Sequence, residues 1–184
     1  MDKIRFSKKE KIAISIILGP LVLFFILHVI FPYQPKTEYS QVIEARDGSI
    51  LHAFLTPGDK WRLKTNLDEI TPELQKTIIK KEDRFFKWHG GINPLAVYRA
   101  FVQNLFSGEI KSGASTISMQ VARMLEPKER NYRNKFLEMF RAMQLEIRYS
   151  KKEILQLYLN LLPYGSNIEG VKTASLVYYD QLPQ

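Results

Sequence analysis

EDRFFKWHGG, residues 82–91, combines two acids, two cations, three aromatic side chains, a histidine and two glycines within ten positions. A carboxylate next to aromatic side chains can line a partly dry cleft, and burial there raises a carboxyl pKa toward the range useful to a general acid or base. The alternative is a solvated helix end with an aromatic anchor, because acids and aromatics often occur at such positions. The stretch therefore predicts either a catalytic carboxylate at Glu82 or an ordinary helix end.

Helices are predicted on both sides of this stretch. Thr71 followed by Pro72 is a favourable helix start, and a helix over 72–81 places Glu82 at its C-terminal end. Apolar residues at helical spacing predict further helices over 94–106, 116–124, 129–149, 151–160 and 168–178. In the helix over 129–149, a buried stripe is expected from Phe136, Phe140, Met143 and Ile147.

A β-hairpin is predicted ahead of the helices. Residues 42–46 and 49–54 are β-type runs on either side of Asp47-Gly48, and glycine accepts the positive φ that a tight turn requires. Residues 61–64 are expected to add a short third strand. With the proline-containing linker before it, this module spans residues 32–70, and we interpret it as a structural collar ahead of a helical domain at 71–184.

The composition restricts the chemistry of the chain. It has 184 residues and a formal net charge of +8, with no cysteine and three histidines. Disulfides and thiolate chemistry are therefore excluded, and a zinc site is disfavoured. A basic surface suits nucleic acid, anionic lipid or a phosphorylated substrate, and charge alone does not choose among them.

An uncharged run of 20 residues at 12–31 points to a membrane. About 20 apolar residues are what a helix needs to cross the hydrocarbon core, and membrane helices tolerate interior residues such as Gly19 and Pro20. The alternative is a cleaved signal peptide, which would have a shorter apolar region followed by small residues at the cleavage site. FPYQP at 31–35 has no such small residues. We therefore predict a single transmembrane helix over 12–31.

The predicted orientation follows from the tail at residues 1–11, which holds five lysines or arginines against two acids. The positive-inside rule leaves this tail in the cytoplasm and places residues from 36 onward outside. Because the outer part is also basic, anionic lipid head groups or lipid-linked phosphates are favoured as partners, and nucleic acid is not expected.

Two further segments bring hydroxyls, cations and a carboxylate together. GASTISMQ at 113–120 is a glycine-led entry into a helix, where free N–H groups and two hydroxyls form an anion site, and Lys111 and Arg123 add charge. The alternative is an ordinary helix cap. Lys135 and Glu138 share a helix face and can bind phosphate directly and through a divalent metal, or can form a surface ion pair of little energetic weight.

In this order, the segments resemble the peptidoglycan glycosyltransferases of family 51, the domain shared by class A penicillin-binding proteins and monofunctional transglycosylases. The resemblance rests on five ordered motifs: Glu82-Asp83-x-x-Phe86-x-x-His89-x-Gly91, Gly113-x-Ser115-Thr116-Ile117-x-x-Gln120, Lys135-x-x-Glu138, Lys151 through Ile154-Leu155-x-x-Tyr158-Leu159-Asn160, and Gly165 to Gly170 with Ala174 and Tyr178. Residues 163–170 are most similar to the 1C branch of the class A proteins.

The resemblance implies a mainly α-helical, lysozyme-like domain at the outer, periplasmic face of the bacterial cytoplasmic membrane. Such a domain polymerises lipid II onto a lipid-linked glycan chain and releases undecaprenyl pyrophosphate. Moenomycin-type inhibitors and other cell-wall synthesis proteins are implied as further partners. The segment holding Phe101, Leu105 and Phe106 lies where the family has a membrane-touching lobe, and the alternative for these side chains is core packing.

The resemblance also implies residue roles. Glu82 is the base that takes the proton of the attacking sugar hydroxyl, and Glu138 orients nearby cations or holds a divalent ion, Mg or Mn. No organic cofactor is implied. Lys135, Arg123 and Lys151 are expected to stabilise the leaving pyrophosphate. The full set of implied substrate-binding residues is Asp83, Phe86, His89, Gly91, Gly113, Ser115, Thr116, Gln120, Arg123, Lys135, Lys151 and Asn160.

The chain departs from the family pattern in three ways. Asn134 stands where an arginine usually precedes Lys135, and Met119 stands where a glutamine usually precedes Gln120. The chain also stops at Gln184, just past the fifth motif, so we expect a C-terminally incomplete glycosyltransferase domain. Two alternatives stay open: a lysozyme-like enzyme that cleaves peptidoglycan, and an inactive, truncated, membrane-anchored scaffold.

Overall fold

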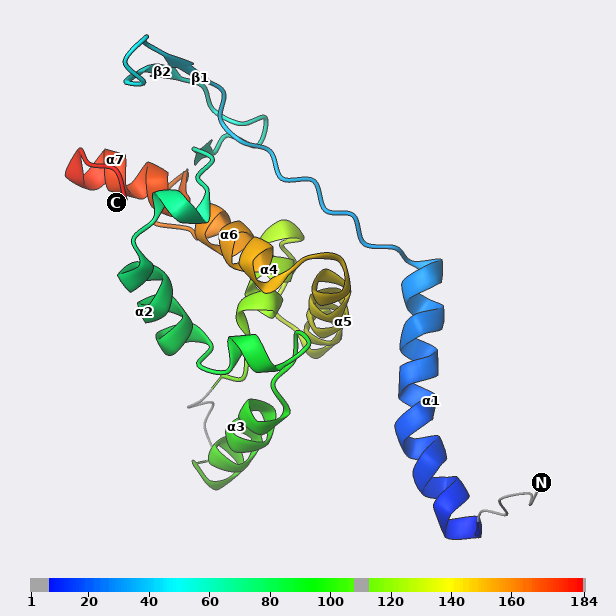
Figure 1. Ribbon diagram of the computed structural model, residues 1–184. Coiled ribbons are helices and arrows are strands. Elements are labelled where there is room, and N and C mark those ends of the chain that lie inside the picture. Colours follow the sequence, from blue (N-terminus) through cyan, green and yellow to red (C-terminus); the bar gives the residue numbers. More distant parts are fainter. Residues whose placement is uncertain (1–6, 108–112, 184) are drawn as a thin grey trace. The chain divides into compact units, whose positions relative to one another are not determined.

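The computed structural model describes residues 7–107 and 113–183. It divides into two units, Met1–Gln34 and Pro35–Gln184, and each is described here by itself (Figure 1). Some predictions concern parts of the chain outside the described residues. These parts are residues 1–6 of the basic tail, Lys111 and the side chain of Phe101.

The first unit is built on one helix, α1 (Lys8–Ile30), which contains Pro20 and covers nearly all of the predicted apolar span. Most of its large apolar side chains, Ile16 and Val29 among them, are exposed. Within residues 7–107 and 113–183, no helix satisfies both the length and the apolarity that a membrane crossing requires. The transmembrane assignment of residues 12–31 is therefore not confirmed and stays a prediction.

The second unit begins with the predicted hairpin. Strands β1 (Val42–Glu44) and β2 (Ile50–Ala53) are antiparallel, with Ile43 opposite His52. In the turn, Asp47 Oδ1 accepts hydrogen bonds from the N–H and the hydroxyl of Ser49, and Gly48 has a φ of 85°. The Asp-Gly turn is thus confirmed, because its side-chain and backbone requirements are local.

The predicted third strand does not join this hairpin. β3 (Trp61–Arg62) pairs in parallel with β4 (Ile168–Glu169), and the Arg62 Nε atom donates to Glu169 at 2.9 Å. The helix predicted from 168 is therefore wrong at its start, and α7 covers Val171–Tyr179. Local patterns could not reveal a pairing between segments more than a hundred residues apart, because each strand has only two residues.

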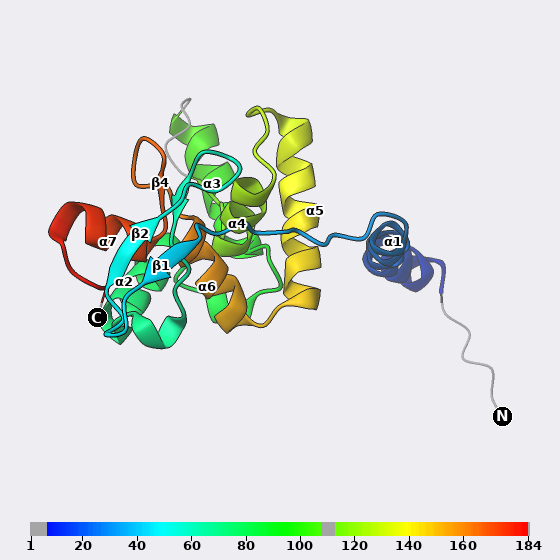
Figure 2. The ribbon, with the colours of Figure 1, turned by 90° about the horizontal axis from the view of Figure 1, so that it is seen from above.

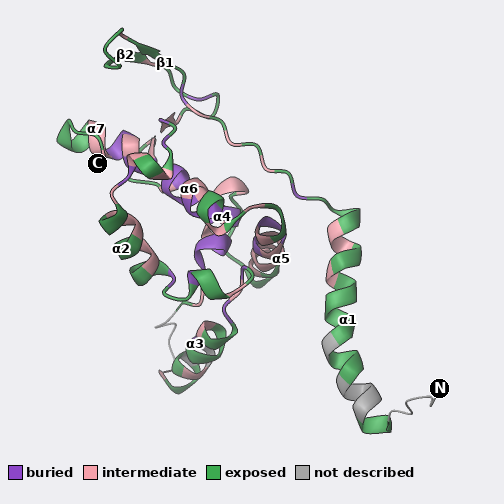
Figure 3. Cartoon of the chain, in the orientation of Figure 1, coloured by how far each residue is buried: buried purple, intermediate pink, exposed green. Residues whose placement is uncertain are grey.

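The remaining elements are helical. They are η1 (Leu67–Glu69), α2 (Pro72–Glu82), η2 (Phe86–Trp88), α3 (Pro94–Ser107), α4 (Ile117–Leu125), α5 (Tyr132–Arg148) and α6 (Lys151–Leu161). Helix α4 packs against both α5 and α6 and has buried residues over most of its length, so it forms the centre of the helical core (Figures 1 and 2). Figure 3 shows the same concentration of buried residues on α4 and α6.

Side-chain caps explain where two of these helices begin. Thr116 caps α4, because its Oγ1 atom accepts the N–H of Met119 at 3.1 Å. Ser150 caps α6 in a reciprocal arrangement with Glu153, whose carboxylate accepts the N–H of Ser150 at 2.7 Å. Both caps stand at the predicted starts of the helices over 116–124 and 151–160, since an N-cap bond depends only on residues within one helical turn.

The buried stripe predicted on α5 is wrong. Phe136 is 70% exposed and Ile147 is also exposed, whereas Ala142, Gln144 and Leu145 are buried. The buried side of α5 carries a small residue because the chain at Gly91 approaches its backbone closely: a Cβ atom added at Gly91 would lie 2.8 Å from the Ala142 carbonyl carbon and oxygen. At Ala142 the close approach of another backbone segment therefore requires a small side chain, which a search for large apolar residues does not detect.

Gly91→Ala is expected to destabilise the domain by about 3 kcal/mol or more, because it combines a backbone clash with a φ of 94° that alanine avoids. Urea unfolding followed by circular dichroism measures this loss. Gly90→Ala is the matched control, since an added Cβ there meets nothing within 4 Å. Equal midpoints for the two variants would show that the Gly91 contact does not constrain the fold.

Candidate active site

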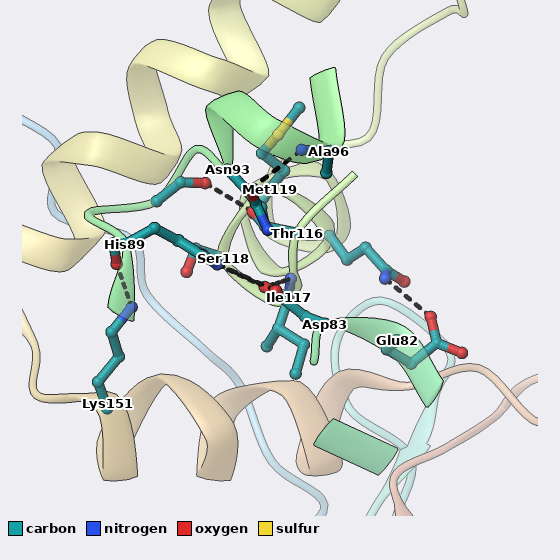
Figure 4. Close-up of polar contacts among 12 residues, drawn as sticks. Glu82, Asp83, His89, Asn93, Ala96, Thr116, Ile117, Ser118, Met119 and Lys151 are labelled. Carbon is teal, nitrogen blue, oxygen red and sulfur yellow. Dashed lines mark hydrogen bonds and ion pairs between the residues drawn. The ribbon is translucent and has the colours of Figure 1, made fainter. Parts of the chain in front are cut away.

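Glu82 lies at the C-terminal end of α2, and a side chain from each of two other helices completes its surroundings. The Gln120 Nε2 atom on α4 donates to Glu82 Oε2 at 3.0 Å (Figure 4), and the Tyr158 hydroxyl on α6 donates to Gln120 Oε1 at 3.5 Å. Burial raises the pKa of Tyr158, the negative charge of Glu82 raises it further, and the positive charge of Arg123 opposes the rise. The first, second and fourth motifs thus meet around one carboxylate.

The environment of Glu82 differs from the sequence prediction of an acid against buried aromatics. Glu82 is exposed, and so are Phe85 and Trp88, whereas Phe86 is buried. The buried acid of this stretch is Asp83. The hydrogen bond from Gln120, rather than an aromatic wall, is therefore what holds the Glu82 carboxylate in place.

Asp83 binds protein groups rather than solvent. Its side chain is 3% exposed, and its two oxygens lie 3.0 and 2.9 Å from His89 Nε2. Asp83 Oδ2 also accepts the N–H of Ile117 at 3.1 Å, at the first turn of α4 (Figure 4). The Asp83 carboxylate therefore joins the loop after α2 to the start of α4. Asp83 also lines a groove beside Glu82, and the substrate-binding role expected for Asp83 and His89 stays a prediction.

Two other residues predicted to bind substrate are buried and form hydrogen bonds with protein groups, although one of them, Thr116, also lines the groove beside Glu82. Thr116 is buried and donates its hydroxyl to the carbonyl of Gly91 at 2.6 Å. Asn160 is fully buried, and its side chain exchanges hydrogen bonds of 2.8 Å with the backbone N–H and carbonyl of Thr65. These contacts link the second motif to the first, and the fourth motif to the segment before α2.

Lys151 also points into the protein. Its Nζ atom donates to the His89 carbonyl at 2.6 Å and to Glu146 at 2.7 Å, and lies 4.5 Å from the centre of the Phe86 ring. The Lys151 ammonium thus has three contacts with protein groups. Lys151 is therefore placed to hold the loop after α2, and its expected contact with a leaving phosphate stays a prediction.

A second group of predicted residues does come together at the surface. Lys135 Nζ donates to Ser115 Oγ at 3.0 Å and pairs with Glu138 at 2.7 Å. The lysine is partly exposed. The ion pair that the sequence analysis gave as an alternative is therefore present, and its lysine also binds Ser115 of the second motif. A cation beside a hydroxyl at the entry to a helix is a suitable contact for a phosphate oxygen.

A groove of about 350 Å³ connects Glu82 with this region, because Glu82 and Ser115 both line it together with Gly113. Four cations that the sequence analysis did not single out also line it: Lys80, Lys81, Arg84 and Arg99. The first three flank Glu82 in the sequence and could have been noticed there. Arg99 comes from α3, and only the tertiary structure brings it to the groove.

The fit of a divalent metal at Glu138 is poor. The Glu138 carboxylate is already paired with Lys135, and the part of the chain that the structure describes holds no group of three acidic or histidine side chains that could bind a metal ion. A magnesium or manganese ion at Glu138 therefore stays a prediction.

A mainly helical domain with small sheets is the architecture of a lysozyme-like transglycosylase domain, and the exposed carboxylate beside a cation-lined groove suits that class. A family model described as Transglycosylase matches residues 47–184. The chain therefore belongs to the transglycosylase family, and the family resemblance predicted from the motifs is confirmed.

Several penicillin-binding proteins are similar to this chain. Penicillin-binding protein 1C of Escherichia coli (strain K12) is 40% identical over 144 residues, which are 78% of this chain and 19% of that protein. Penicillin-binding protein 1A of the same strain is 38% identical over 146 residues, 78% of this chain and 17% of that protein. Penicillin-binding protein 1A of Aquifex aeolicus (strain VF5) is 32% identical over 176 residues, 91% of this chain and 24% of that protein. The chain thus spans less than a quarter of the length of each of these relatives.

Proposed function

We propose that this domain is a peptidoglycan glycosyltransferase that polymerises lipid II. The single observation that carries the proposal is the exposed Glu82 carboxylate, held by Gln120 at the edge of a cation-lined groove. The acceptor hydroxyl attacks the anomeric carbon of the donor sugar, and the bond from that carbon to pyrophosphate breaks. A β-1,4 bond forms with inversion, the hydroxyl proton passes to Glu82, and undecaprenyl pyrophosphate leaves as an anion.

The base is needed because a sugar hydroxyl is a poor nucleophile until its proton is removed. Gln120 donates to Glu82 Oε2, and we assign Oε1 to the acceptor hydroxyl. A carboxylate that is oriented before the substrate arrives loses less entropy when the reacting atoms meet.

The leaving pyrophosphate gains negative charge as its bond to the sugar breaks, so preplaced cations lower the barrier. We assign this role to Lys135, which Ser115 and Glu138 orient, and to the groove cations described above. We assign no substrate contact to Lys151, because protein groups already bind its ammonium.

Incubation of the full chain with fluorescent lipid II in detergent micelles tests the proposal. Formation of a long glycan that a muramidase then digests is the expected result. Release of fragments from purified sacculi, without polymerisation, would favour the peptidoglycan-cleaving alternative. If the chain shows neither activity and moenomycin produces no thermal shift, the scaffold alternative replaces the proposal.

We further propose that the domain works at the outer face of a bacterial cytoplasmic membrane, attached by the apolar residues of α1 and touching lipid through α3. Leu105 is 66% exposed and Phe106 is 86% exposed, which favours the lipid contact over core packing for this segment. The basic residues at the groove suit anionic head groups and lipid-linked phosphates.

Hydrogen exchange of the full chain, with and without vesicles of phosphatidylglycerol and phosphatidylcholine, measures this contact. Amides of α3 are expected to exchange at least about tenfold more slowly with vesicles, since lipid excludes water from the exposed apolar side chains. The first turns of α5, where Tyr132 and Phe136 are also exposed, provide an internal control. Equal protection of the two helices would exclude α3 as the contact.

A further inference from the structure

The carboxylate of Glu146 joins three helices of the core. Glu146 lies near the C-terminal end of α5, and its side chain is 9% exposed. Its Oε1 atom accepts a hydrogen bond from the fully buried Ser118 on α4 and pairs with Lys151, the first residue of α6, at 2.7 Å. None of the five motifs that indicate the family includes Glu146.

Lys151 extends this cluster to the loop after α2. Its ammonium donates to the His89 carbonyl at 2.6 Å, and the ring of the same histidine binds Asp83. The ammonium thus needs Glu146 as its counterion while it holds His89. The side chains of this ion pair are 27% exposed for Lys151 and 9% exposed for Glu146, so removing one partner leaves the other charge only partly compensated by solvent, which is unfavourable.

The two protein groups that bind Asp83 are each connected to Glu146. One is the N–H of Ile117, the residue before Ser118, and the other is the ring of His89, whose carbonyl binds Lys151. Asp83 is next to Glu82 in the chain. Gln120, which holds Glu82, is two residues after Ser118 on α4. Glu146 therefore contacts α4 directly, through Ser118, and reaches the loop after α2 through Lys151, and these two segments determine where Glu82 and Gln120 meet.

We infer that Glu146 is a positioning residue for Glu82, acting through Ser118 and Lys151 without touching substrate. The inference rests on the proposed glycosyl transfer, because it concerns the placement of the base of that reaction. Misplacement of a reacting group by about 1 Å can lower a rate about 100-fold. Glu146→Gln should therefore lower kcat by about 10- to 100-fold and leave KM within about threefold.

A double variant separates positioning from stability. Glu146→Gln leaves the Lys151 ammonium without a counterion, whereas Glu146→Gln with Lys151→Met removes both charges and should recover most of the thermal stability. The double variant still lacks the bond from Lys151 to the His89 carbonyl, so its kcat should stay at least about tenfold below wild type. Recovery of kcat together with stability would overturn the inference.

A readout that needs no catalysis is the NMR signal of the Gln120 side-chain amide, identified by its absence in Gln120→Leu. The signal should move in Glu146→Gln and in the double variant, because the contact with Glu82 changes. It should not move in Glu129→Gln, whose carboxylate is exposed in the segment before α5. An unmoved signal in both Glu146 variants overturns the inference. If the wild-type chain does not polymerise lipid II, the proposed function fails, and this signal still decides the role of Glu146.

Discussion

Glu82→Gln is expected to abolish polymerisation of labelled lipid II, with a rate about 10² to 10⁴ times lower than wild type, the range that a general base contributes. The amide has nearly the same shape and still accepts the hydrogen bond from Gln120, but it cannot take the proton of the acceptor hydroxyl. Initial rates with fluorescent lipid II measure the loss.

Folding and ligand binding provide the controls for this variant. Because Glu82 is exposed, its replacement should change the free energy of unfolding by no more than about 0.5 kcal/mol, and moenomycin should bind as tightly as before. Glu73→Gln, in the exposed first turn of the same helix, should retain the full rate. If Glu82→Gln polymerises lipid II at the rate of Glu73→Gln, Glu82 is not the base.

Asp83→Ala is expected to have the opposite profile, a large loss of stability. The change leaves the buried His89 Nε2 atom and the N–H of Ile117 without their acceptor. Each unsatisfied buried group costs about 1–3 kcal/mol, so the loss of both bonds should lower the free energy of unfolding by about 2–6 kcal/mol. Urea unfolding at several temperatures measures the change.

Two comparison variants define the role of the Asp83 carboxylate. Asp83→Asn keeps one acceptor oxygen and should lose roughly half as much stability as Asp83→Ala. Asp68→Ala removes an exposed carboxylate in η1 and should change stability by less than about 0.5 kcal/mol. An Asp83→Ala chain as stable as Asp68→Ala would mean that the carboxylate serves the substrate rather than the fold.

These two adjacent acids show how far the sequence can be interpreted. The first motif includes both Glu82 and Asp83. The resemblance implies that Glu82 is the base and that Asp83 binds substrate. Both acids line the groove, but the structure gives them different surroundings: Glu82 is exposed at the end of α2, whereas the Asp83 side chain is 3% exposed and binds the first turn of α4. Two neighbouring residues thus differ in burial, because burial depends on which other elements pack against each side chain.

The elements themselves were largely predictable. The start of α2 at Pro72, the caps at Thr116 and Ser150, and the turn at Asp47-Gly48 all depend on residues close together in the sequence. Patterns of this kind need no knowledge of the tertiary fold. The buried stripe of α5 was not predictable in the same way, because the close approach of Gly91 comes from a distant segment.

The sequence by itself determined the family, the helices and hairpin, and the placement of Glu82 at the end of a helix. Only the tertiary structure decided which motif residues meet the groove and which hold the core together. Lys151 and Asn160 form hydrogen bonds with backbone carbonyls of other segments, and Arg99 of α3 lines the groove. The physical reason is that the role of a polar side chain depends on the group with which it forms a hydrogen bond, and these groups lie far away in the sequence.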